Sequence, residues 1–288
     1  EVVEGLMIEL FGHFSSWRIT DPFPRIPWRE AMARWGSDKP DMRFGVELQD
    51  VTEILREHGP EFLQRALQEP KTSARALVLP GGASLSRKVF EQYGKELEGE
   101  GGSGLSWLGL GEDGSWRGSW AKHLKQAPAL EQHLRALPGF EPGCALLFVT
   151  EKDLLAMKLA GRLRARLGRE FGLIEEEVFA FCWIVDFPMY EEDEETGEVV
   201  FSHNPFSMPQ GGLEALESMD PLEILAYQYD LVCNGYELSS GAIRNHRPDI
   251  MARAFEIAGY PPEALEEKFG ALYRAFQYGP PPHGGIAP

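Results

Sequence analysis

The most informative pattern of apolar and polar positions is a hairpin signal near residue 235. Two short β-prone apolar runs are separated there by Asn234-Gly235. Asn-Gly between two such runs favours a tight turn, because both residues tolerate a positive φ. A two-residue turn at this point pairs Val232 with Glu237. The pattern therefore predicts an antiparallel hairpin within residues 226–246.

Elsewhere, apolar residues that recur every three or four positions predict helices. The helix at 1–14 has apolar residues at 2, 6, 10 and 14, interleaved with others at 3, 7 and 11, and we expect it to pack in the core. The helix at 151–171 carries four arginines, which we expect on a solvated face. Further helices are expected at 28–35, 47–67, 84–97, 124–137, 213–229 and 261–278. Strands are expected at 74–79, 105–110, 115–120, 144–149, 178–187 and 199–201.

The order of these elements predicts two domains. The chain has 288 residues and is 43% hydrophobic, which is enough for two cores. From about residue 51 to residue 150, strands and helices mix without any cluster of catalytic residue types, which is typical of an inserted α+β module. The segments at 1–50 and 151–288 flank this module and are expected to form one domain together. The expected fold class is therefore α+β.

Composition narrows the class of protein. The net charge of −17 argues against a general nucleic-acid coat or a membrane-surface protein, although local contacts to phosphate or RNA stay open. Cys144, Cys182 and Cys233 each sit in an apolar run, which favours buried thiols in a reducing compartment. No apolar run approaches about 18 residues, so we expect no membrane span. The chain has no initiator methionine and ends on small residues, so we expect a piece of a longer protein.

Two carboxylates on the hairpin are the first candidates for chemistry. Side chains alternate between faces along a strand, so Asp230 and Glu237 share one face and lie diagonally across from each other. Diagonal neighbours are roughly 7–8 Å apart at Cα, within reach of one shared ion. Two such carboxylates repel each other unless a cation lies between them, and Mg²⁺ carrying phosphates is the obvious one. Solvated charges on a surface hairpin are the alternative that the pattern leaves open.

Arg244 and His203 are two further candidates. Strict alternation from Glu237 puts Arg244 on the opposite face, but the Ser-Ser-Gly sequence at 239–241 is suited to a bulge that re-aims it toward the carboxylates. A planar guanidinium there would suit a substrate carboxylate. His203 follows a strand directly, where a side chain can point into a cleft, and a structural histidine is the alternative.

Seven phrases span nearly the whole chain: RWGSDKPD (34–41), WIVDFP (183–188), SHNPF (202–206), YDLVCNGYE (229–237), GAIRNH (241–246), EKFG (267–270) and YGPPPHGG (278–285). Together, and in this order, they resemble the bacterial aspartyl-tRNA synthetases, which are class II aminoacyl-tRNA synthetases. The resemblance implies an incomplete antiparallel class II sheet with flanking helices. The module at 51–150 resembles the GAD insertion domain of these enzymes, which is also found in tRNA-dependent amidotransferases.

The resemblance assigns roles to the candidate residues. Glu237 matches the family's ATP/Mg²⁺ carboxylate, and Asp230 matches its companion. Arg244 matches the arginine that binds the α-carboxylate or the side-chain carboxylate of aspartate. His203 matches the first histidine of the family's His-His-Pro-Phe motif, which contacts the substrate. Asn204 stands where many relatives have the second histidine, and it supplies hydrogen bonds there.

Asp38 and Lys39 match a family phrase that lies near the substrate pocket.

The resemblance also implies a cytoplasmic homodimer that activates L-aspartate with ATP and Mg²⁺ and transfers it to tRNA(Asp). Whether tRNA(Asn) is a second acceptor is left to test. The family's ATP-clasping arginine and lysine-bearing aspartate loop are expected before Glu1, and its Gly-Leu-Asp-Arg motif after Pro288. The anticodon-binding domain is expected outside the chain, so we expect the chain alone to be inactive. Two alternatives stay open: a non-catalytic paralogue that binds tRNA, and a subunit related to the amidotransferases.

Overall fold

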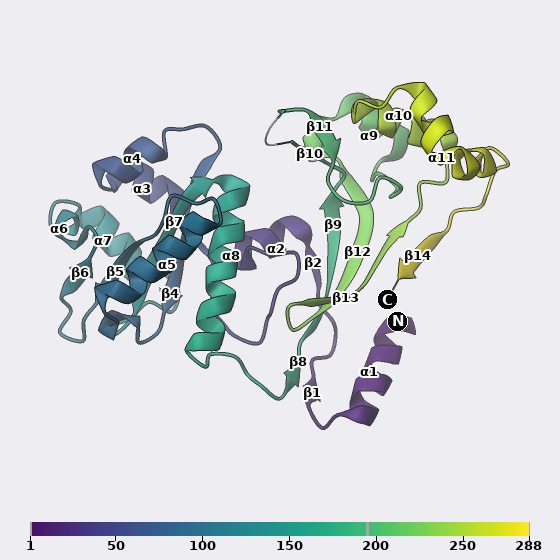
Figure 1. Ribbon diagram of the computed structural model, residues 1–288. Coiled ribbons are helices and arrows are strands. Elements are labelled where there is room, and N and C mark those ends of the chain that lie inside the picture. The colour runs from purple at the N-terminus through teal and green to yellow at the C-terminus, as the bar shows by residue number, and fades with distance from the viewer. Residues whose placement is uncertain (1, 194–195, 288) are drawn as a thin grey trace. The chain divides into compact units, whose positions relative to one another are not determined.

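The computed structural model describes residues 2–193 and 196–287 (Figure 1). The chain folds into two compact units. Unit 1 combines Glu1–Glu30 with Glu177–Pro288, and unit 2 is the continuous stretch Ala31–Glu176. Within the described residues, no helix combines the length and the apolar character that crossing a membrane requires.

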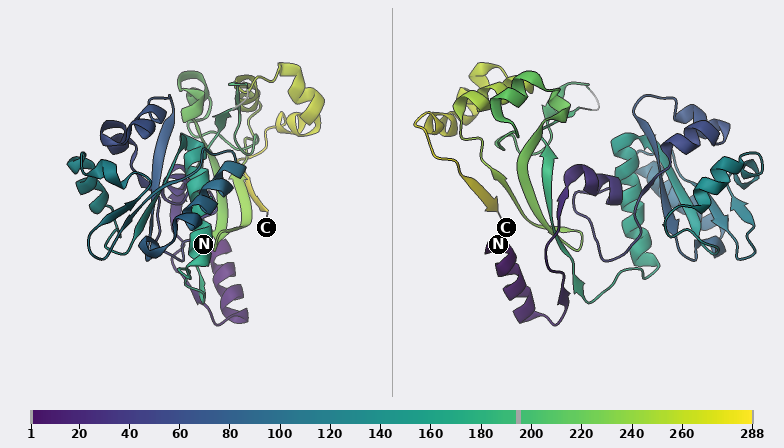
Figure 2. Two further views of the ribbon diagram at one scale, coloured as in Figure 1. Left: turned by 60° about the vertical axis from the view of Figure 1, so that its left-hand side comes forward. Right: turned by 180° about the vertical axis from the view of Figure 1, so that it is seen from behind.

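Unit 1 is built around a five-stranded sheet. Its strands are β2 (Arg25–Pro27), β9 (Phe181–Pro188), β12 (Leu225–Cys233), β13 (Tyr236–Ile243) and β14 (Gly284–Ala287). They lie in the order β14-β13-β12-β9-β2, and all neighbours are antiparallel except β2 and β9. Two short pairs accompany the sheet: β1 (Arg18–Ile19) with β8 (Val178–Phe179), and β10 (Tyr190–Glu192) with β11 (Val199–Phe201). The β12–β13 hairpin, which the sequence predicts, runs along unit 1 in the views of Figures 1 and 2.

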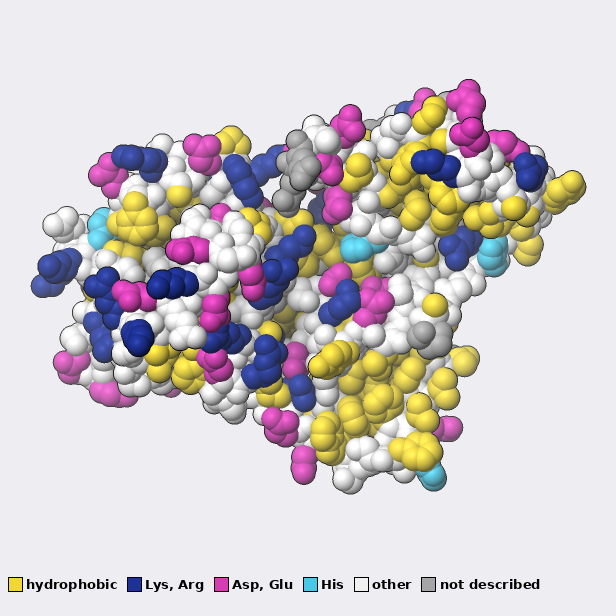
Figure 3. All heavy atoms as spheres, in the orientation of Figure 1, with side chains coloured by type: hydrophobic (Ala, Val, Ile, Leu, Met, Phe, Trp, Pro, Cys, Tyr) yellow, Lys and Arg dark blue, Asp and Glu magenta, His cyan; other side chains and the backbone are white. Residues whose placement is uncertain are grey.

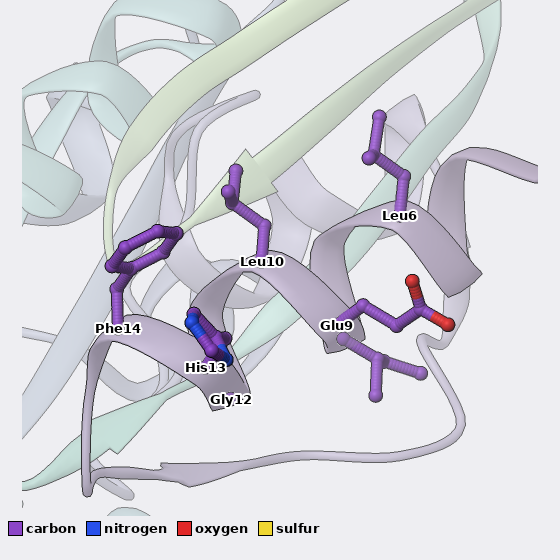
Figure 4. A pocket seen from close by; sticks show the side chains of 7 residues that line it. Leu6, Glu9, Leu10, Gly12, His13 and Phe14 are labelled. Carbon is purple, nitrogen blue, oxygen red and sulfur yellow. The ribbon is translucent and has the colours of Figure 1, made fainter.

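Helix α1 (Val2–Phe14) packs on this sheet by one face only. Val3, Met7 and Phe11 contact the apolar cluster of β9 and β12, and no residue of the helix is fully buried. The expected core packing is confirmed for these three residues but is wrong for the stripe at 2, 6, 10 and 14, because a helix on one side of a sheet presents a single face to it. The stripe is exposed instead, at Val2 (87%), Leu6 (56%), Leu10 (44%) and Phe14 (79%). Figure 3 shows hydrophobic side chains gathered over α1, and Figure 4 shows Leu6, Leu10 and Phe14 on one side of it.

The three helices that follow β11 lie together in unit 1 (Figure 1). They are α9 (Gly212–Ser218), α10 (Pro248–Ile257) and α11 (Pro262–Phe276). The helix expected at 213–229 ends at Ser218 instead, and β12 follows it. The sequence contains the reason, because Pro221 cannot continue a helix. In addition, Asp220 caps a short 3₁₀ turn that begins at Pro221, where its carboxylate accepts from the backbone N–H of Leu222 (3.0 Å).

Unit 2 is a five-stranded antiparallel sheet with helices on both faces, in the order β3-β4-β7-β5-β6. Its strands are β3 (Gln49–Asp50), β4 (Thr72–Leu79), β5 (Ser106–Leu110), β6 (Trp116–Gly118) and β7 (Ala145–Lys152). Its helices are α2 (Trp28–Trp35, shared with unit 1), α3 (Thr52–His58), α4 (Glu61–Ala66), α5 (Arg87–Gly99), α6 (Ala121–Leu124), α7 (Pro128–Arg135) and α8 (Asp153–Glu170). Ala76 and Val78 of β4 face the core with α3, α4, α6 and α7, whereas Leu77 and Leu79 face the core with α5 and α8.

Unit 2 extends beyond the module expected at 51–150. Helix α8 packs against β4 and β7, and its Leu159 and Leu163 belong to a core of unit 2. Residues 31–50 and 151–176 therefore fall in the same compact unit as the module, not with the flanking segments that we expected to form one domain. The assignment of 51–150 as a GAD-like insertion stays a prediction.

Arg164 of α8 is buried, with an exposed fraction of 2%, so the expected solvated face is wrong for this arginine. Its guanidinium donates to the carbonyl oxygens of Asp41 (2.9 Å), Phe44 (3.0 Å) and Val46. It also lies 3.9 Å from the centroid of the Phe44 ring. Arg164 is buried because the carbonyl groups of residues 41–46, which are distant in sequence, surround this one position of the helix. Arg164 thereby fixes the segment 41–46 on α8.

Two glycines bring the turn after α2 against the backbone of α8. Gly36 has a φ of +65°, and a Cβ placed on it would overlap the carbonyl oxygen of Met157 and lie 2.8 Å from the Cα of Gly161. A Cβ on Gly161 would lie 2.5 Å from the carbonyl oxygen of Gly36. Only two residues without side chains permit this approach.

Candidate functional site

The hairpin turn forms as the sequence predicts. Asn234 has a φ of +54° and Gly235 a φ of +86°, and Val232 pairs with Glu237. The Asn234 side chain also ties the turn to the chain before β9. Its Oδ1 accepts from the backbone N–H of Ala180 (2.9 Å), and its Nδ2 donates to the carbonyl oxygen of Val178 (2.8 Å). Asparagine is therefore needed here for its backbone conformation and for its amide.

Replacing Asn234 with alanine is expected to lower the free energy of unfolding by about 2 kcal/mol, because two hydrogen bonds and a residue tolerant of positive φ are lost together. Asn234→Asp is the matched control, since aspartate keeps the acceptor and tolerates the turn but loses the donor. We expect a smaller loss for Asn234→Asp. Urea denaturation would measure both, and equal stability of the alanine variant and the parent chain would contradict this role.

A β-bulge sets which face of the sheet each charge occupies. Leu231 pairs with Ser239 rather than with Leu238, so Leu238 is the extra residue on β13. We expected the bulge at 239–241, and it lies just before that stretch. Beyond it, Asp230 pairs with Ser240. Alternation from Ser240 then puts Arg244 on the face of Asp230.

The three charges follow one another along this face. Glu237 pairs with Val232 near the turn, Asp230 lies two residues farther along β12, and Arg244 lies four residues beyond the partner of Asp230. The strand from Glu237 to Arg244 covers roughly 20 Å. Asp230 is 4% exposed, Glu237 is exposed and Arg244 is half-buried. The bulge leaves Asp230 and Glu237 as diagonal neighbours and brings Arg244 to their face, so the row is long enough for an elongated ligand.

The donor set of this row fits Mg²⁺ that arrives with phosphates. In the described part of the chain, no group of three or more His, Cys, Asp or Glu side chains lies close enough to hold a metal ion. Mg²⁺ is usually bound by one or two carboxylates together with water and substrate phosphates, and not by an all-protein cage. Asp230 and Glu237 are the two residues that would hold it.

The segment after β11 lies beside the end of β13. The backbone N–H of Met208 donates to the carbonyl oxygen of Ile243 (2.8 Å), and the backbone N–H of Asn245 donates to the carbonyl oxygen of Phe206 (2.8 Å). This brings the phrase 202–206 to the Arg244 end of the row. Within it, the exposed His203 meets the ring of Phe187 edge-on at 4.9 Å between centroids.

Asn204 organises this segment from within. Its Oδ1 accepts from the backbone N–H of Phe206 (3.0 Å), which forms an Asx-type turn. The amide therefore shapes the backbone beside Arg244, a role that the sequence pattern did not indicate.

Asp38 and Lys39 belong to unit 2, whereas the other candidate residues belong to unit 1. The Nζ of Lys39 lies 3.3 Å from Oδ1 of Asp38, and the backbone N–H of Lys39 donates to Oγ of Ser37 (3.0 Å). Their role in a pocket stays a prediction.

Two buried polar residues beside Arg244 were missed by sequence reasoning. Ser207 and Asn245 are both 0% exposed, and Oγ of Ser207 and both amide atoms of Asn245 have no hydrogen-bond partner within 2–193 and 196–287. A buried polar group without a partner costs about 1–3 kcal/mol. The only sequence signal was position, since Ser207 directly follows the phrase 202–206.

The cysteines are free and buried, as the sequence predicts. Burial raises the pKa of the Cys182 thiol to about 12, and the neighbouring Cys233 adds to this effect. At neutral pH this thiol is protonated and a poor nucleophile, so the structure offers no reason to place Cys182 in the chemistry of the site.

Comparison with known proteins places the chain in a family. The tRNA synthetases class II (D, K and N) match it over residues 1–288. The chain is 51% identical over 287 residues to the aspartate–tRNA ligase of Streptomyces coelicolor, covering 99% of this chain and 48% of that protein. It is 50% identical over 288 residues to the aspartate–tRNA(Asp/Asn) ligase of Acidiphilium cryptum, with the same coverage of 99% and 48%.

A structural match to a solved aspartyl-tRNA synthetase from Entamoeba histolytica covers 74% of this chain and 38% of the solved chain, at 15% identity and a TM-score of 0.28. A likeness this distant carries no argument. The chain spans about half the length of the curated relatives that it matches. The family match, by contrast, extends over the whole chain. The chain thus belongs to the class II tRNA synthetases of the D, K and N group.

Proposed function

We propose that the protein containing this chain is an aspartate–tRNA ligase, which activates L-aspartate with ATP and transfers it to tRNA(Asp). The observation that carries the proposal is the row of Glu237, Asp230 and Arg244 along one sheet face, in a chain about half identical to proteins of that name. An aminoacyl-adenylate is itself elongated and negatively charged at its phosphate. A row with carboxylates for Mg²⁺ at one end and a guanidinium at the other complements such a ligand.

In the first step, an oxygen of the aspartate α-carboxylate attacks the α-phosphorus of ATP, and pyrophosphate leaves. In the second step, a ribose hydroxyl of the tRNA terminus attacks the acyl carbon, and AMP leaves. Arg244 binds a carboxylate of aspartate, either the α-carboxylate or that of the side chain. Asp230 and Glu237 would hold Mg²⁺, which would supply neutralisation of phosphate charge. The residues contribute chiefly positioning and charge complementarity.

The remaining assignments belong to the same proposal. His203 contacts aspartate, and Asn204 shapes the segment beside it. The full-length protein is a homodimer with a GAD-like insertion, and the isolated chain is inactive. Because one relative is named for both tRNA(Asp) and tRNA(Asn), charging of each tRNA should be measured.

The test is aspartate-dependent exchange of pyrophosphate into ATP by the full-length protein. Arg244→Ala is expected to lower kcat/KM for aspartate by about 100-fold, because a charge-assisted bidentate contact is lost. Arg247→Ala is the matched control: Arg247 is three residues away, exposed and paired with Asp249 (2.5 Å). Exchange that does not depend on aspartate would refute the proposed function. Exchange without loss in Arg244→Ala would refute the role of this arginine.

A further inference from the structure

Ser207 faces Arg244 directly across a two-residue antiparallel bridge. The flanking hydrogen bonds, Met208 to Ile243 and Asn245 to Phe206, make the two residues a non-hydrogen-bonded pair. In such a pair the Cα atoms are roughly 4.5 Å apart and the side chains are at their closest. Ser207 and Arg244 therefore project from the same face of the sheet, side by side.

Both side chains lack a partner in the described residues. Ser207 is 0% exposed, and its Oγ makes no hydrogen bond to any described residue, although a serine hydroxyl can rotate to suit any neighbour within reach. The half-buried Arg244 guanidinium has neither an ion pair nor a side-chain hydrogen bond to residues 2–193 or 196–287. A buried donor beside an unpaired cation is the arrangement expected of a site that a carboxylate completes.

We propose that Ser207 is a further substrate-binding residue, whose hydroxyl donates to the same carboxylate of aspartate that Arg244 binds. This inference rests on the proposed function. A carboxylate accepts at about four lone-pair positions, so the two parallel bonds of a guanidinium leave room for a third donor. Ser207 thus fixes the orientation of a carboxylate that Arg244 attracts by charge.

Ser207→Ala in the full-length protein is expected to raise KM for aspartate by about 10- to 100-fold and to leave KM for ATP within about twofold. Ser207→Thr keeps the hydroxyl and should retain most of the affinity for aspartate. Because the alanine variant removes a hydroxyl that makes no hydrogen bond to the described residues, its midpoint of urea unfolding should equal or exceed that of the parent protein.

Ser239→Ala is the matched control. Ser239 is also buried, and its Oγ also lacks a hydrogen bond in the described chain, but it pairs with Leu231 and so projects from the opposite face. If buried hydroxyls had only a structural role, Ser207→Ala and Ser239→Ala would change KM for aspartate to the same extent. We expect Ser239→Ala to leave KM for aspartate unchanged.

Two competitive inhibitors distinguish the carboxylates of aspartate. L-Asparagine lacks the side-chain carboxylate, and the α-amide of aspartate lacks the α-carboxylate. Ser207→Ala should weaken inhibition only by the analogue that retains the carboxylate bound by Arg244. An unchanged KM for aspartate in Ser207→Ala, with a raised KM in Arg244→Ala, would overturn this inference alone. No effect in either variant would overturn the proposed site as well.

Discussion

Replacing Arg164 with methionine is expected to lower the free energy of unfolding of unit 2 by about 3–5 kcal/mol. Methionine fills similar volume, but it leaves the carbonyl groups of Asp41, Phe44 and Val46 without their donor in the interior. Burial lowers the pKa of Arg164 to about 10, so the guanidinium is still protonated at neutral pH and its bonds are charge-assisted. Urea denaturation followed by tryptophan fluorescence would measure the loss.

Arg162→Met on the same helix is the control. Arg162 is exposed and pairs with Glu100 (2.7 Å), and such surface pairs contribute little. We expect its removal to change the free energy of unfolding by less than about 0.5 kcal/mol. Similar losses for the two arginines would mean that the carbonyl contacts of Arg164 do not stabilise the fold.

Gly36→Ala is the second substitution with a large expected effect, again about 3–5 kcal/mol of unfolding free energy. The new methyl group would overlap the carbonyl oxygen of Met157, and the φ of +65° adds strain for any residue with a side chain. The turn after α2 would have to move away from α8. Thermal unfolding would report the loss, and hydrogen exchange of α8 amides would locate it.

Gly139→Ala separates the two contributions to this loss. Gly139 also lies in unit 2 and has a φ of +73°, but a Cβ there would meet nothing within 4 Å. Its substitution should therefore cost only the conformational strain, about 1 kcal/mol. A Gly36→Ala variant no less stable than Gly139→Ala would show that the close approach of the two backbones carries no energy.

Local signals in the sequence sufficed for some elements and failed for others. The Asn234-Gly235 turn was predictable because its geometry depends on the conformational freedom of two adjacent residues. The bulge at Leu238 was misplaced by one step, since serine and glycine at 239–241 are suited to a bulge but the register is fixed by pairing on both sides. The burial of Arg164 could not be read from its helix, because the groups that accept from it come from residues 41–46.

The candidate site divides in the same way. Residue types and phrases pointed to Asp230, Glu237 and Arg244, because charge at a defined strand spacing is a property of the sequence itself. The sequence could not point to Ser207 as a site residue. Ser207 stands out because it is completely buried and its hydroxyl has no hydrogen-bond partner among the described residues, and only the folded chain shows these two properties. Helix α1 illustrates the opposite error, where a periodic apolar stripe was predicted to be buried and proved exposed.

The discontinuity of unit 1 has a consequence for synthesis on the ribosome. Strand β2 pairs with β9, yet the whole of unit 2 is translated between them. At about 5–20 residues per second, β2 would leave the ribosome on the order of ten seconds before its partner. Unit 2 is contiguous and can fold during that interval, whereas the sheet of unit 1 closes only when β9 and β12 emerge. Connectivity alone thus imposes an order of assembly, in which all of unit 2 is synthesised before the charged row can form.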